Sequence, residues 1–147
     1  MASKSDEELR RLSVELRILE ANAENIQSRI NMVNAVTTDL AYASMTLEGL
    51  EKEKKNSELI VPIGGSSYIT AKLASPDKVI VGMGAGVSVE KPLQEAKDII
   101  KKRLENLEKT RLSLQQQLSQ FAERINENRQ RVEDLLAERQ EKTPRDV

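Results

Sequence analysis

Apolar residues recur along two long stretches of this chain at alternating spacings of three and four. The first stretch contains twelve such positions between Leu9 and Leu47, and ten of them are apolar. These positions are Leu9, Leu12, Leu16, Leu19, Ala23, Ile26, Ile30, Val33, Thr37, Leu40, Ser44 and Leu47. A mean spacing of about 3.5 residues held over this length is typical of a coiled-coil seam. The pattern predicts a helix over residues 5–56, opened by a capping box of Ser5 and Glu8.

The same spacing returns in the last third of the chain, at eleven positions of which nine are apolar. They are Ile100, Leu104, Leu107, Arg111, Leu114, Leu118, Phe121, Ile125, Asn128, Val132 and Leu135. This pattern predicts a second helix over residues 92–142, with Pro92 in its first turn and Thr143-Pro144 just past its end. Two helices of similar length joined by a short insert predict an antiparallel hairpin.

The seams of the two helices can be aligned with each other. In the antiparallel pairing that we predict, the small Ala23 lies opposite Phe121, the only large ring in either seam. Asn128 then lies opposite Leu16, and a polar residue at such a position fixes the register at some cost in stability.

Between residues 57 and 91 the apolar pattern changes to a period of two, which is typical of strands. Turn residues at 64–67, 75–78 and 84–86 separate four short strands, so the segment predicts two β-hairpins. A sheet this small buries little and leaves open edges. We therefore expect the strands to be the surface on which subunits assemble, through Leu59, Val61, Ile63, Ile69, Leu73, Val79, Val81, Val87 and Val89.

The predicted fold class is α+β and mainly α, with two β-hairpins inserted between the helices of a long antiparallel coiled-coil hairpin. Residues 1–147 are expected to form one elongated domain. Ala, Glu, Lys, Leu and Arg supply 70 of the 147 residues, close to the share found in coiled coils. The three aromatic residues are too few to anchor a globular core.

Charge and composition argue against most kinds of chemistry. The chain has 23 Lys+Arg, 24 Asp+Glu, no Cys and no His, so it lacks a thiolate, the usual metal ligands and the usual general base. A net charge of -1 gives no general attraction to nucleic acid. No apolar run approaches the roughly 20 residues that span a membrane. We therefore expect a cytoplasmic protein that is not an enzyme and binds no cofactor, metal, nucleic acid or membrane.

Two short motifs have alternative interpretations. The glycines at 82–86 resemble a phosphate-binding loop, but they lead into a strand rather than a helix, which favours a turn. The basic runs at 52–55 and 101–103 could contact nucleic acid, but no aromatic residues are interleaved for stacking on bases. A solvated helix surface is the favoured interpretation of these runs.

Three apolar residues lie off the seams near the chain termini. Val14 and Ile18 are four residues apart on the first helix, and Leu136 lies at the matching end of the second. They are either scattered surface residues, which are common, or an adhesive apolar tip on a charged stalk. The sequence pattern leaves both interpretations open.

The layout of helix, two hairpins and helix resembles alpha-type subunits of the prefoldin family, of the archaeal type. The resemblance is carried by Leu59-Ile60-Val61-Pro62-Ile63-Gly64-Gly65 and by the run from Lys78-Val79-Ile80-Val81-Gly82-Met83-Gly84 to Val89-Glu90-Lys91. It implies a hexamer of two alpha-type and four beta-type subunits, whose hairpins form an oligomeric β-barrel.

The resemblance also implies an ATP-independent chaperone that captures non-native proteins at its coiled-coil tips and delivers them to a group II chaperonin. The family motifs do not specify the tip residues. From location and exposure we assign client contact to Val14, Ile18 and Leu136, helped by the seam residues Leu9, Leu12, Val132 and Leu135. The alternative from another functional class is a structural coiled-coil scaffold without chaperone activity.

Overall fold

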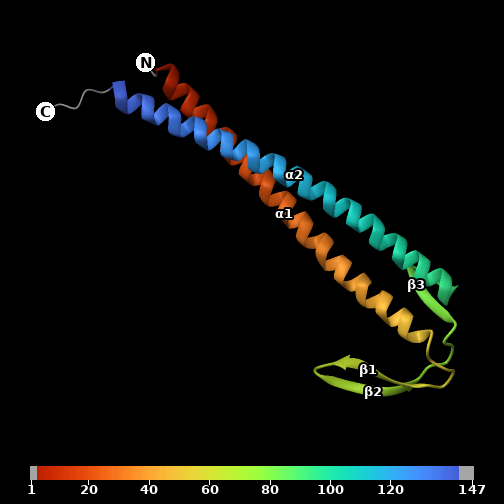
Figure 1. Ribbon diagram of the computed structural model, residues 1–147. Coiled ribbons are helices and arrows are strands. Elements are labelled where there is room, and N and C mark those ends of the chain that lie inside the picture. The colour runs from red at the N-terminus through yellow and green to blue at the C-terminus, as the bar shows by residue number, and fades with distance from the viewer. Residues whose placement is uncertain (1–2, 143–147) are drawn as a thin grey trace. The chain divides into compact units, whose positions relative to one another are not determined.

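A computed structural model describes residues 3–142 of the chain (Figure 1). In chain order the elements are α1 (Lys4–Leu50), β1 (Glu58–Gly64), β2 (Ser67–Lys72), β3 (Lys78–Gly84), β4 (Val87–Pro92) and α2 (Leu93–Lys142). The predicted fold, with two long helices and two antiparallel hairpins between them, is confirmed. The structure comprises two compact units, which we call the terminal unit (Met1–Asn34 and Lys109–Val147) and the hairpin unit (Ala35–Glu108). Both helices contribute to both units.

The predicted seams coincide with the buried sides of the helices. All twelve seam positions of α1 and all eleven of α2 are buried or half-buried, including the polar Thr37, Ser44, Arg111 and Asn128. Most of the residues between them are exposed. The alternating spacing of three and four residues therefore identified the packed face of each helix.

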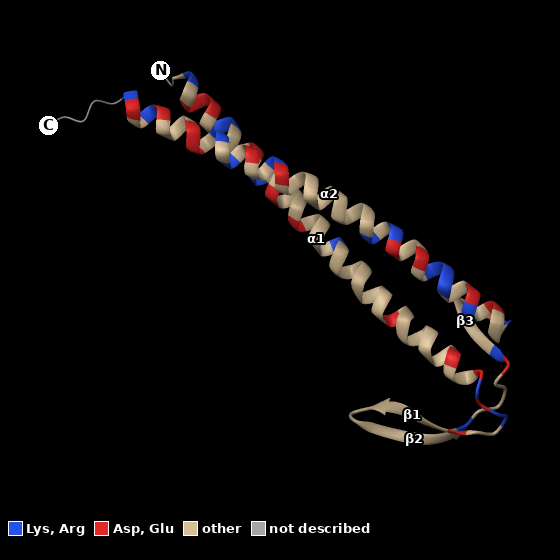
Figure 2. Ribbon diagram, in the orientation of Figure 1, with Lys and Arg blue, Asp and Glu red and all other residues tan. Residues whose placement is uncertain are grey.

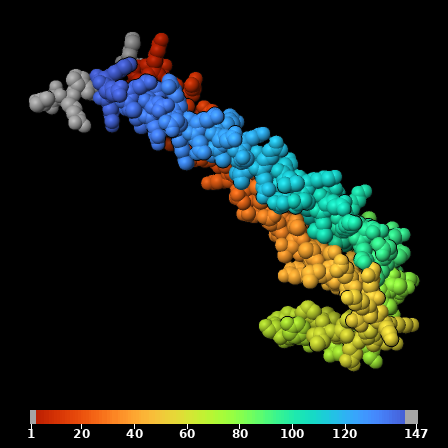
Figure 3. Space-filling model, viewed as in Figure 1, coloured from red at the N-terminus to blue at the C-terminus, as the bar shows by residue number. Residues whose placement is uncertain are grey.

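The two helices are antiparallel within the terminal unit. Asp6 pairs with Arg139 and Glu20 pairs with Arg129, so residue numbers rise along one helix as they fall along the other. The core of this unit is a cluster of buried Ile26, Ile30 and Leu114, against which Val33, Leu118 and Phe121 pack. Figure 3 shows the side chains of α1 and α2 in contact along this unit.

The N-terminal cap of α1 differs from the prediction. The Ser3 Oγ accepts a hydrogen bond from the Asp6 backbone N–H (3.3 Å), and the Asp6 carboxylate accepts one from the Ser3 N–H (3.4 Å). The prediction of Ser5 and Glu8 as the capping box is therefore wrong. Because the helix already begins at Lys4, Ser3 occupies the capping position, and Glu8 is used instead in an ion pair with Arg131.

The C-terminal end of α1 also differs, since the helix ends at Leu50 rather than at residue 56. Residues 51–55 are all charged and provide no apolar side chain to continue the seam. The last turn is tightened by i→i+3 hydrogen bonds from Lys52 N to Gly49 O (3.2 Å) and from Glu53 N to Leu50 O (3.1 Å). The backbone then turns at Asn56, which has a φ of 69°.

The predicted start of α2 is one residue early. Pro92 is the last residue of β4 rather than part of the first helical turn, because the ladder to β3 extends to a pair between Pro92 and Lys78. The helix begins at Leu93, whose N–H donates to the Asp77 carbonyl (2.9 Å). Thr143-Pro144, predicted to end this helix, lies outside the described residues.

The two hairpins are built alike. Each has a two-residue loop in the left-handed region, Gly65-Ser66 (φ 57° and 59°) in the first and Ala85-Gly86 (φ 51° and 74°) in the second. Positive φ at both central residues is typical of a type I′ turn, whose twist matches that of the flanking strands. Each loop is preceded by a register shift in the ladder, between Pro62 and Gly64 in β1 and between Gly82 and Gly84 in β3.

The hairpins differ in how they contact the rest of the hairpin unit. Val81 of β3 is buried in a cluster with Leu47, Ala96 and Ile100 of the two helices. The Arg103 guanidinium adds a hydrogen bond to the Gly82 carbonyl (2.7 Å). By contrast, β1 and β2 contain no buried residue, and none of their residues belongs to the cluster formed with the helices. The β3–β4 hairpin is therefore anchored within its own chain, whereas the β1–β2 hairpin is not.

Candidate interaction surface

An apolar strip lies on α1 close to its N-terminal end. Val14 and Ile18 are 58% and 57% exposed, and their spacing of four places them one above the other on one helix face. They line an open groove of about 460 Å³ with Arg10, Arg11 and Glu15. The strip is thus an apolar surface with a charged border.

Leu136 of α2 is 45% exposed, as its position off the seam predicted. It does not line the groove that contains Val14 and Ile18. The three off-seam residues are therefore all accessible, but only the two on α1 share one groove.

The four seam residues predicted to assist in client contact are less accessible than the three off-seam residues. Leu12 and Leu135 are buried, with 7% and 4% of their surface exposed. Leu9 and Val132 are half-buried. A ligand could contact the buried pair only if the helix ends separated, since both side chains lie in the seam.

Ion pairs join the two helices near this end of the terminal unit. The Arg131 Nε lies 3.0 Å from Glu8 Oε1 and its Nη2 lies 3.4 Å from Glu8 Oε2, while Arg139 lies 3.1 Å from Asp6. The hydrogen bond and the charge of Glu8 raise the pKa of Arg131 above its ordinary value. These side chains are solvent-accessible, so the pairs favour the antiparallel arrangement but add little stability.

A buried polar group lies in the seam of the same unit. Asn128 is 5% exposed, and its Nδ2 donates to the Leu12 carbonyl at 3.0 Å. Because a helical carbonyl points toward the residue four positions later, this contact lies level with Leu16, which the predicted pairing places opposite Asn128. The Oδ1 of Asn128 is buried without a hydrogen-bond partner.

The strands present the second apolar surface. Of the nine residues predicted to assemble subunits, Val61, Ile63, Ile69, Val87 and Val89 are exposed, and Leu59, Leu73 and Val79 are half-buried. Val81 is different, because it is buried against the helices of its own chain and offers no surface to a second chain.

Four exposed apolar residues of the strands, among them the three most exposed, were not among the predicted ones. Ile60 and Ile80 are 74% and 76% exposed, Tyr68 is 62% exposed and Met83 is 49% exposed. They lie between the residues that the alternating pattern selected. The signal that could have found them is the nearly continuous apolar run in β1 and β3, which is typical of strands covered on both faces.

Other kinds of site have no support in the described part of the chain. Within residues 3–142, no group of three Asp, Glu, His or Cys side chains is placed to hold a metal ion. No helix in the same range is apolar enough over a sufficient length to cross a membrane. The glycines at 84–86 form a hairpin turn between β3 and β4, as the favoured interpretation required.

Comparison with known proteins gives consistent matches. The family model described as "Prefoldin subunit" matches residues 19–140. The "Prefoldin subunit alpha" of Methanococcoides burtonii is 34% identical over 125 residues, which cover 85% of this chain and 91% of that protein. The "Putative prefoldin subunit alpha" of Aquifex aeolicus is 32% identical over 122 residues, covering 83% of this chain and 82% of that protein.

A solved structure is also similar. It is described as "Cryo-EM structure of filamentous PFD from Methanocaldococcus jannaschii", and it matches with a TM-score of 0.66 and 28% sequence identity. The match covers 84% of this chain and 96% of that one. Most of the chain thus has a counterpart in these relatives, and the range matched by the family model includes both hairpins.

Proposed function

The chain belongs to the prefoldin family, and from that premise we propose that it captures non-native proteins at the end of the terminal unit where α1 begins and α2 ends. Members of this family are chaperone subunits. Capture needs no ATP in this proposal, and the bound client is passed on to a group II chaperonin. The observation that carries the proposal is the exposure of Val14, Ile18 and Leu136 on helices whose other exposed residues near this end are mostly charged or polar.

The physical chemistry of such a surface favours weak, reversible capture. Burial of apolar area gains about 25 cal/mol per Å², so a patch of a few hundred Å² offers only a few kcal/mol before the cost of ordering is subtracted. Several tips acting on one client raise the avidity without raising the affinity of any single tip. An assembly of subunits could therefore hold a client and still release it.

Fraying of the helix ends would enlarge this surface. Leu9 and Val132 are already half-buried, whereas Leu12 and Leu135 would become accessible if the last turns separated. Helix ends open more readily than helix centres, and the exposed ion pairs at this end resist opening only weakly. The seam residues are therefore proposed as secondary contacts.

The hairpin unit supports hetero-oligomeric assembly. Two-stranded hairpins are marginal in water, and their unpaired edges and apolar faces invite other strands. Ile60 and Ile80, each about three-quarters exposed, are the apolar groups that would gain most from being covered. We propose a hexamer in which two copies of this chain join four beta-type subunits, with the strands forming an oligomeric β-barrel.

The test of client capture replaces the tip residues with serine. A triple variant with Val14→Ser, Ile18→Ser and Leu136→Ser is assembled with a beta-type subunit. A denatured client enzyme is then diluted from guanidinium chloride, and its aggregation is followed by light scattering. We expect the variant to assemble with unchanged mass but to lose most of its suppression of aggregation.

The matched control carries Met32→Ser, Val36→Ser and Leu112→Ser, which remove three apolar side chains of similar exposure (67%, 49% and 54%) away from the tip. This control should suppress aggregation like the unmodified chain. If the tip variant also retains full activity, the client site lies elsewhere. If neither the unmodified assembly nor its variants slow aggregation, the alternative of a structural scaffold is favoured.

Assembly is tested separately by native mass spectrometry of the chain with and without a beta-type partner. A mass of two copies of this chain plus four partners supports the hexamer. Because one similar structure is described as filamentous, a ladder of increasing masses is the outcome that would contradict it.

A further inference from the structure

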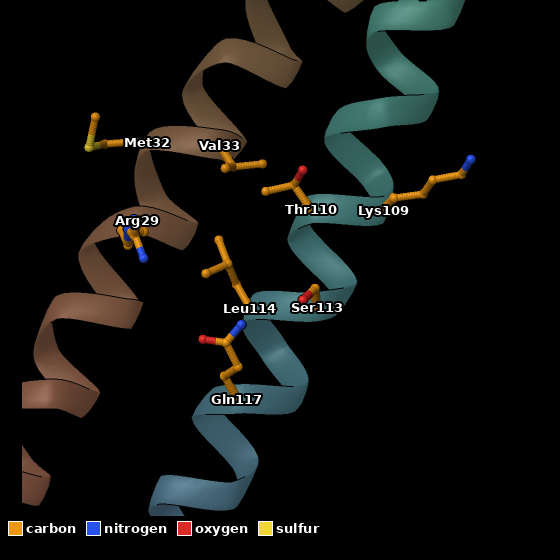
Figure 4. A pocket seen from close by; sticks show the side chains of 8 residues that line it. All are labelled: Arg29, Met32, Val33, Lys109, Thr110, Ser113, Leu114 and Gln117. Atoms are coloured by element: carbon orange, nitrogen blue, oxygen red, sulfur yellow. The ribbon is translucent and has the colours of Figure 1, made fainter.

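Two pockets that are lined by both helices have different surroundings. One, of about 540 Å³, lies in the terminal unit, and all the side chains that line it come from α1 and α2 (Figure 4). Backbone groups inside a helix are paired along that helix, so nothing at this pocket indicates a ligand. The other, of about 320 Å³, lies in the hairpin unit and is lined by α1, α2 and residues 79–82 of β3. A strand edge beside a pocket does indicate an occupant, because an unpaired edge pairs with another strand.

The proline at the end of β4 shows which backbone groups of β3 face away from β4. In an antiparallel ladder, pairs that exchange two hydrogen bonds alternate with pairs that exchange none. Pro92 has no N–H and lies opposite Lys78, so this pair belongs to the second kind. The alternation assigns Ile80 and Gly82 to the same kind. The N–H and C=O groups of Lys78, Ile80 and Gly82 therefore point to the free edge of β3.

This free edge is open at Ile80 and closed at Gly82. Within residues 3–142, the backbone N–H and C=O of Ile80 have no hydrogen-bond partner. The Gly82 carbonyl accepts a hydrogen bond from Nη2 of Arg103 (2.7 Å), and the same nitrogen lies 3.9 Å from the Met83 sulfur. Ile80, Gly82 and Arg103 all line the smaller pocket. A strand added along this edge thus finds room beside Ile80 and meets a cation at Gly82.

A charge beside a strand edge is one of the ways in which proteins prevent uncontrolled strand pairing. The strands of this chain lack such a charge over most of their length, because residues 59–71 and 79–89 contain no charged residue. In Figure 2, β1 and β2 are accordingly tan along most of their length. Arg103 of α2 supplies a charge at the β3 edge, whereas the other residues that line the smaller pocket are uncharged.

We propose that Arg103 is a positioning residue that ends strand pairing at Gly82, so that a strand of a neighbouring subunit pairs with β3 only at Lys78 and Ile80. An apolar side chain of that strand is seated in the pocket, where Leu47 forms part of the lining. The inference deepens the proposed oligomeric assembly and rests on it for the identity of the partner. It does not rest on it for the contact between Arg103 and Gly82.

The test compares the unmodified full-length chain with Arg103→Met, each without a beta-type partner. Native mass spectrometry over a series of concentrations gives the distribution of monomers, dimers and larger species. Methionine keeps an apolar stem at position 103 but carries no charge and donates no hydrogen bond. The released Gly82 carbonyl adds one backbone hydrogen bond to an added strand, so dimers and larger species should appear at an about two- to tenfold lower concentration. An unchanged distribution would overturn the proposal.

Two single substitutions separate the contact with Gly82 from the loss of a charge. Lys102→Met removes the same charge from an exposed neighbouring position of α2 and should leave the distribution unchanged. Arg103→Lys keeps a cationic donor at position 103 and should stay within about twofold of the unmodified chain. If either variant assembles like Arg103→Met, the contact with Gly82 is not the cause and the proposal is wrong.

A double variant shows whether the additional assembly uses the β3 edge. Ile80→Pro removes the free N–H at this edge without removing a bond to β4, and in the Arg103→Met background it should restore the distribution of the unmodified chain. Glu90 lies opposite Ile80 in the ladder, so Glu90→Pro removes the N–H at the opposite edge of the same hairpin and should not restore it. Equal effects of the two prolines would mean that a loosened hairpin causes the change, which contradicts the proposal.

The result is independent of the proposed hexamer. If the unmodified chain and a beta-type partner do not give the hexamer while Arg103→Met shifts as expected, the proposed stoichiometry is wrong and the role of Arg103 stands. If the hexamer forms and Arg103→Met does not shift, the role of Arg103 is wrong and the hexamer stands.

Discussion

Replacement of Asn128 by leucine should stabilise the helix pair of the terminal unit while weakening its register. Asn128 is 95% buried, makes one hydrogen bond to the Leu12 carbonyl and leaves its Oδ1 without a partner. A buried unsatisfied oxygen costs about 1–3 kcal/mol, and a buried leucine side chain gains about 1.5–3 kcal/mol. Loss of the existing hydrogen bond costs only about 0.5–1.5 kcal/mol. The expected net effect is a gain of about 1–5 kcal/mol in the free energy of unfolding.

The gain is measured by urea unfolding of the full chain, followed by far-UV circular dichroism. Asn126→Leu is the matched control, because Asn126 lies on the same helix but is exposed. Its effect should stay within about 0.5 kcal/mol, as is usual for surface substitutions. If Asn128→Leu lowers the urea midpoint or leaves it unchanged, the unsatisfied oxygen is not a net cost, and a bound water is the simplest explanation.

The register is measured by disulfide crosslinking, for which the chain is suited because it contains no native cysteine. The predicted pairing places Leu12 opposite Val132, so cysteines at these two positions should crosslink readily in the unmodified background. A slip by one heptad would instead bring Leu12 opposite Ile125. We expect crosslinking of cysteines at positions 12 and 125 to become detectable only in the Asn128→Leu background, because the buried amide no longer penalises the slipped pairing. Identical crosslinking in both backgrounds would refute a role of Asn128 in register.

Three further experiments test the packing and the turns. Arg103→Met removes the hydrogen bond to the backbone of β3 and should speed amide hydrogen exchange in the β3–β4 hairpin, while leaving the β1–β2 hairpin unchanged. Leu19→Ala truncates a side chain that is only 2% exposed, and it should lower the free energy of unfolding, measured in urea, by about 2–5 kcal/mol. Ile18→Ala, one position away and 57% exposed, should lower it by less than about 1 kcal/mol. Gly84→Ala places a Cβ on a backbone with a φ of 99°, and the resulting strain should lower the melting temperature. Ala85→Gly removes the Cβ from a backbone with a φ of 51°, and the loss of strain should raise the melting temperature slightly.

The sequence predicted the parts of the fold that depend on periodicity. The seams were predicted because burial on a helix recurs along one face, and every seam position, even the polar Ser44 and Arg111, is at least half-buried. The hairpins were predicted from the change of period and from glycine-rich turns, where Gly65 and Gly86 provide left-handed φ values.

The errors at the ends of α1 come from local ambiguity. Ser3 is followed three residues later by Asp6, and Ser5 is followed three residues later by Glu8, so the sequence contains two candidate capping boxes. The structure uses the first of them, while Glu8 pairs with Arg131 across the helix pair. At the other end, residues 51–55 favour helix by composition, but nothing lies in position to bury them.

Tertiary packing explains why the strand surface was predicted only in part. Val61 and Val81 occupy equivalent positions in two similar hairpins, yet Val61 is 39% exposed and Val81 is 5% exposed. No local pattern distinguishes them, because the difference comes from Leu47 and Ile100, which pack on one hairpin only.

The unequal packing of the two hairpins has a consequence for assembly. A two-stranded hairpin without a buried residue is at best marginally stable, because little apolar burial offsets the conformational entropy of ordering its chain, and the β1–β2 hairpin is of this kind. Its exposed apolar residues, such as Ile60 and Tyr68, gain stability only when another chain covers them. A partner that binds the folded hairpin but not the unfolded one stabilises it by mass action. If the strands form the proposed assembly surface, folding of the β1–β2 hairpin and formation of the oligomer are linked. The β3–β4 hairpin, held by Val81 and Arg103, would then provide a preformed surface on which assembly begins.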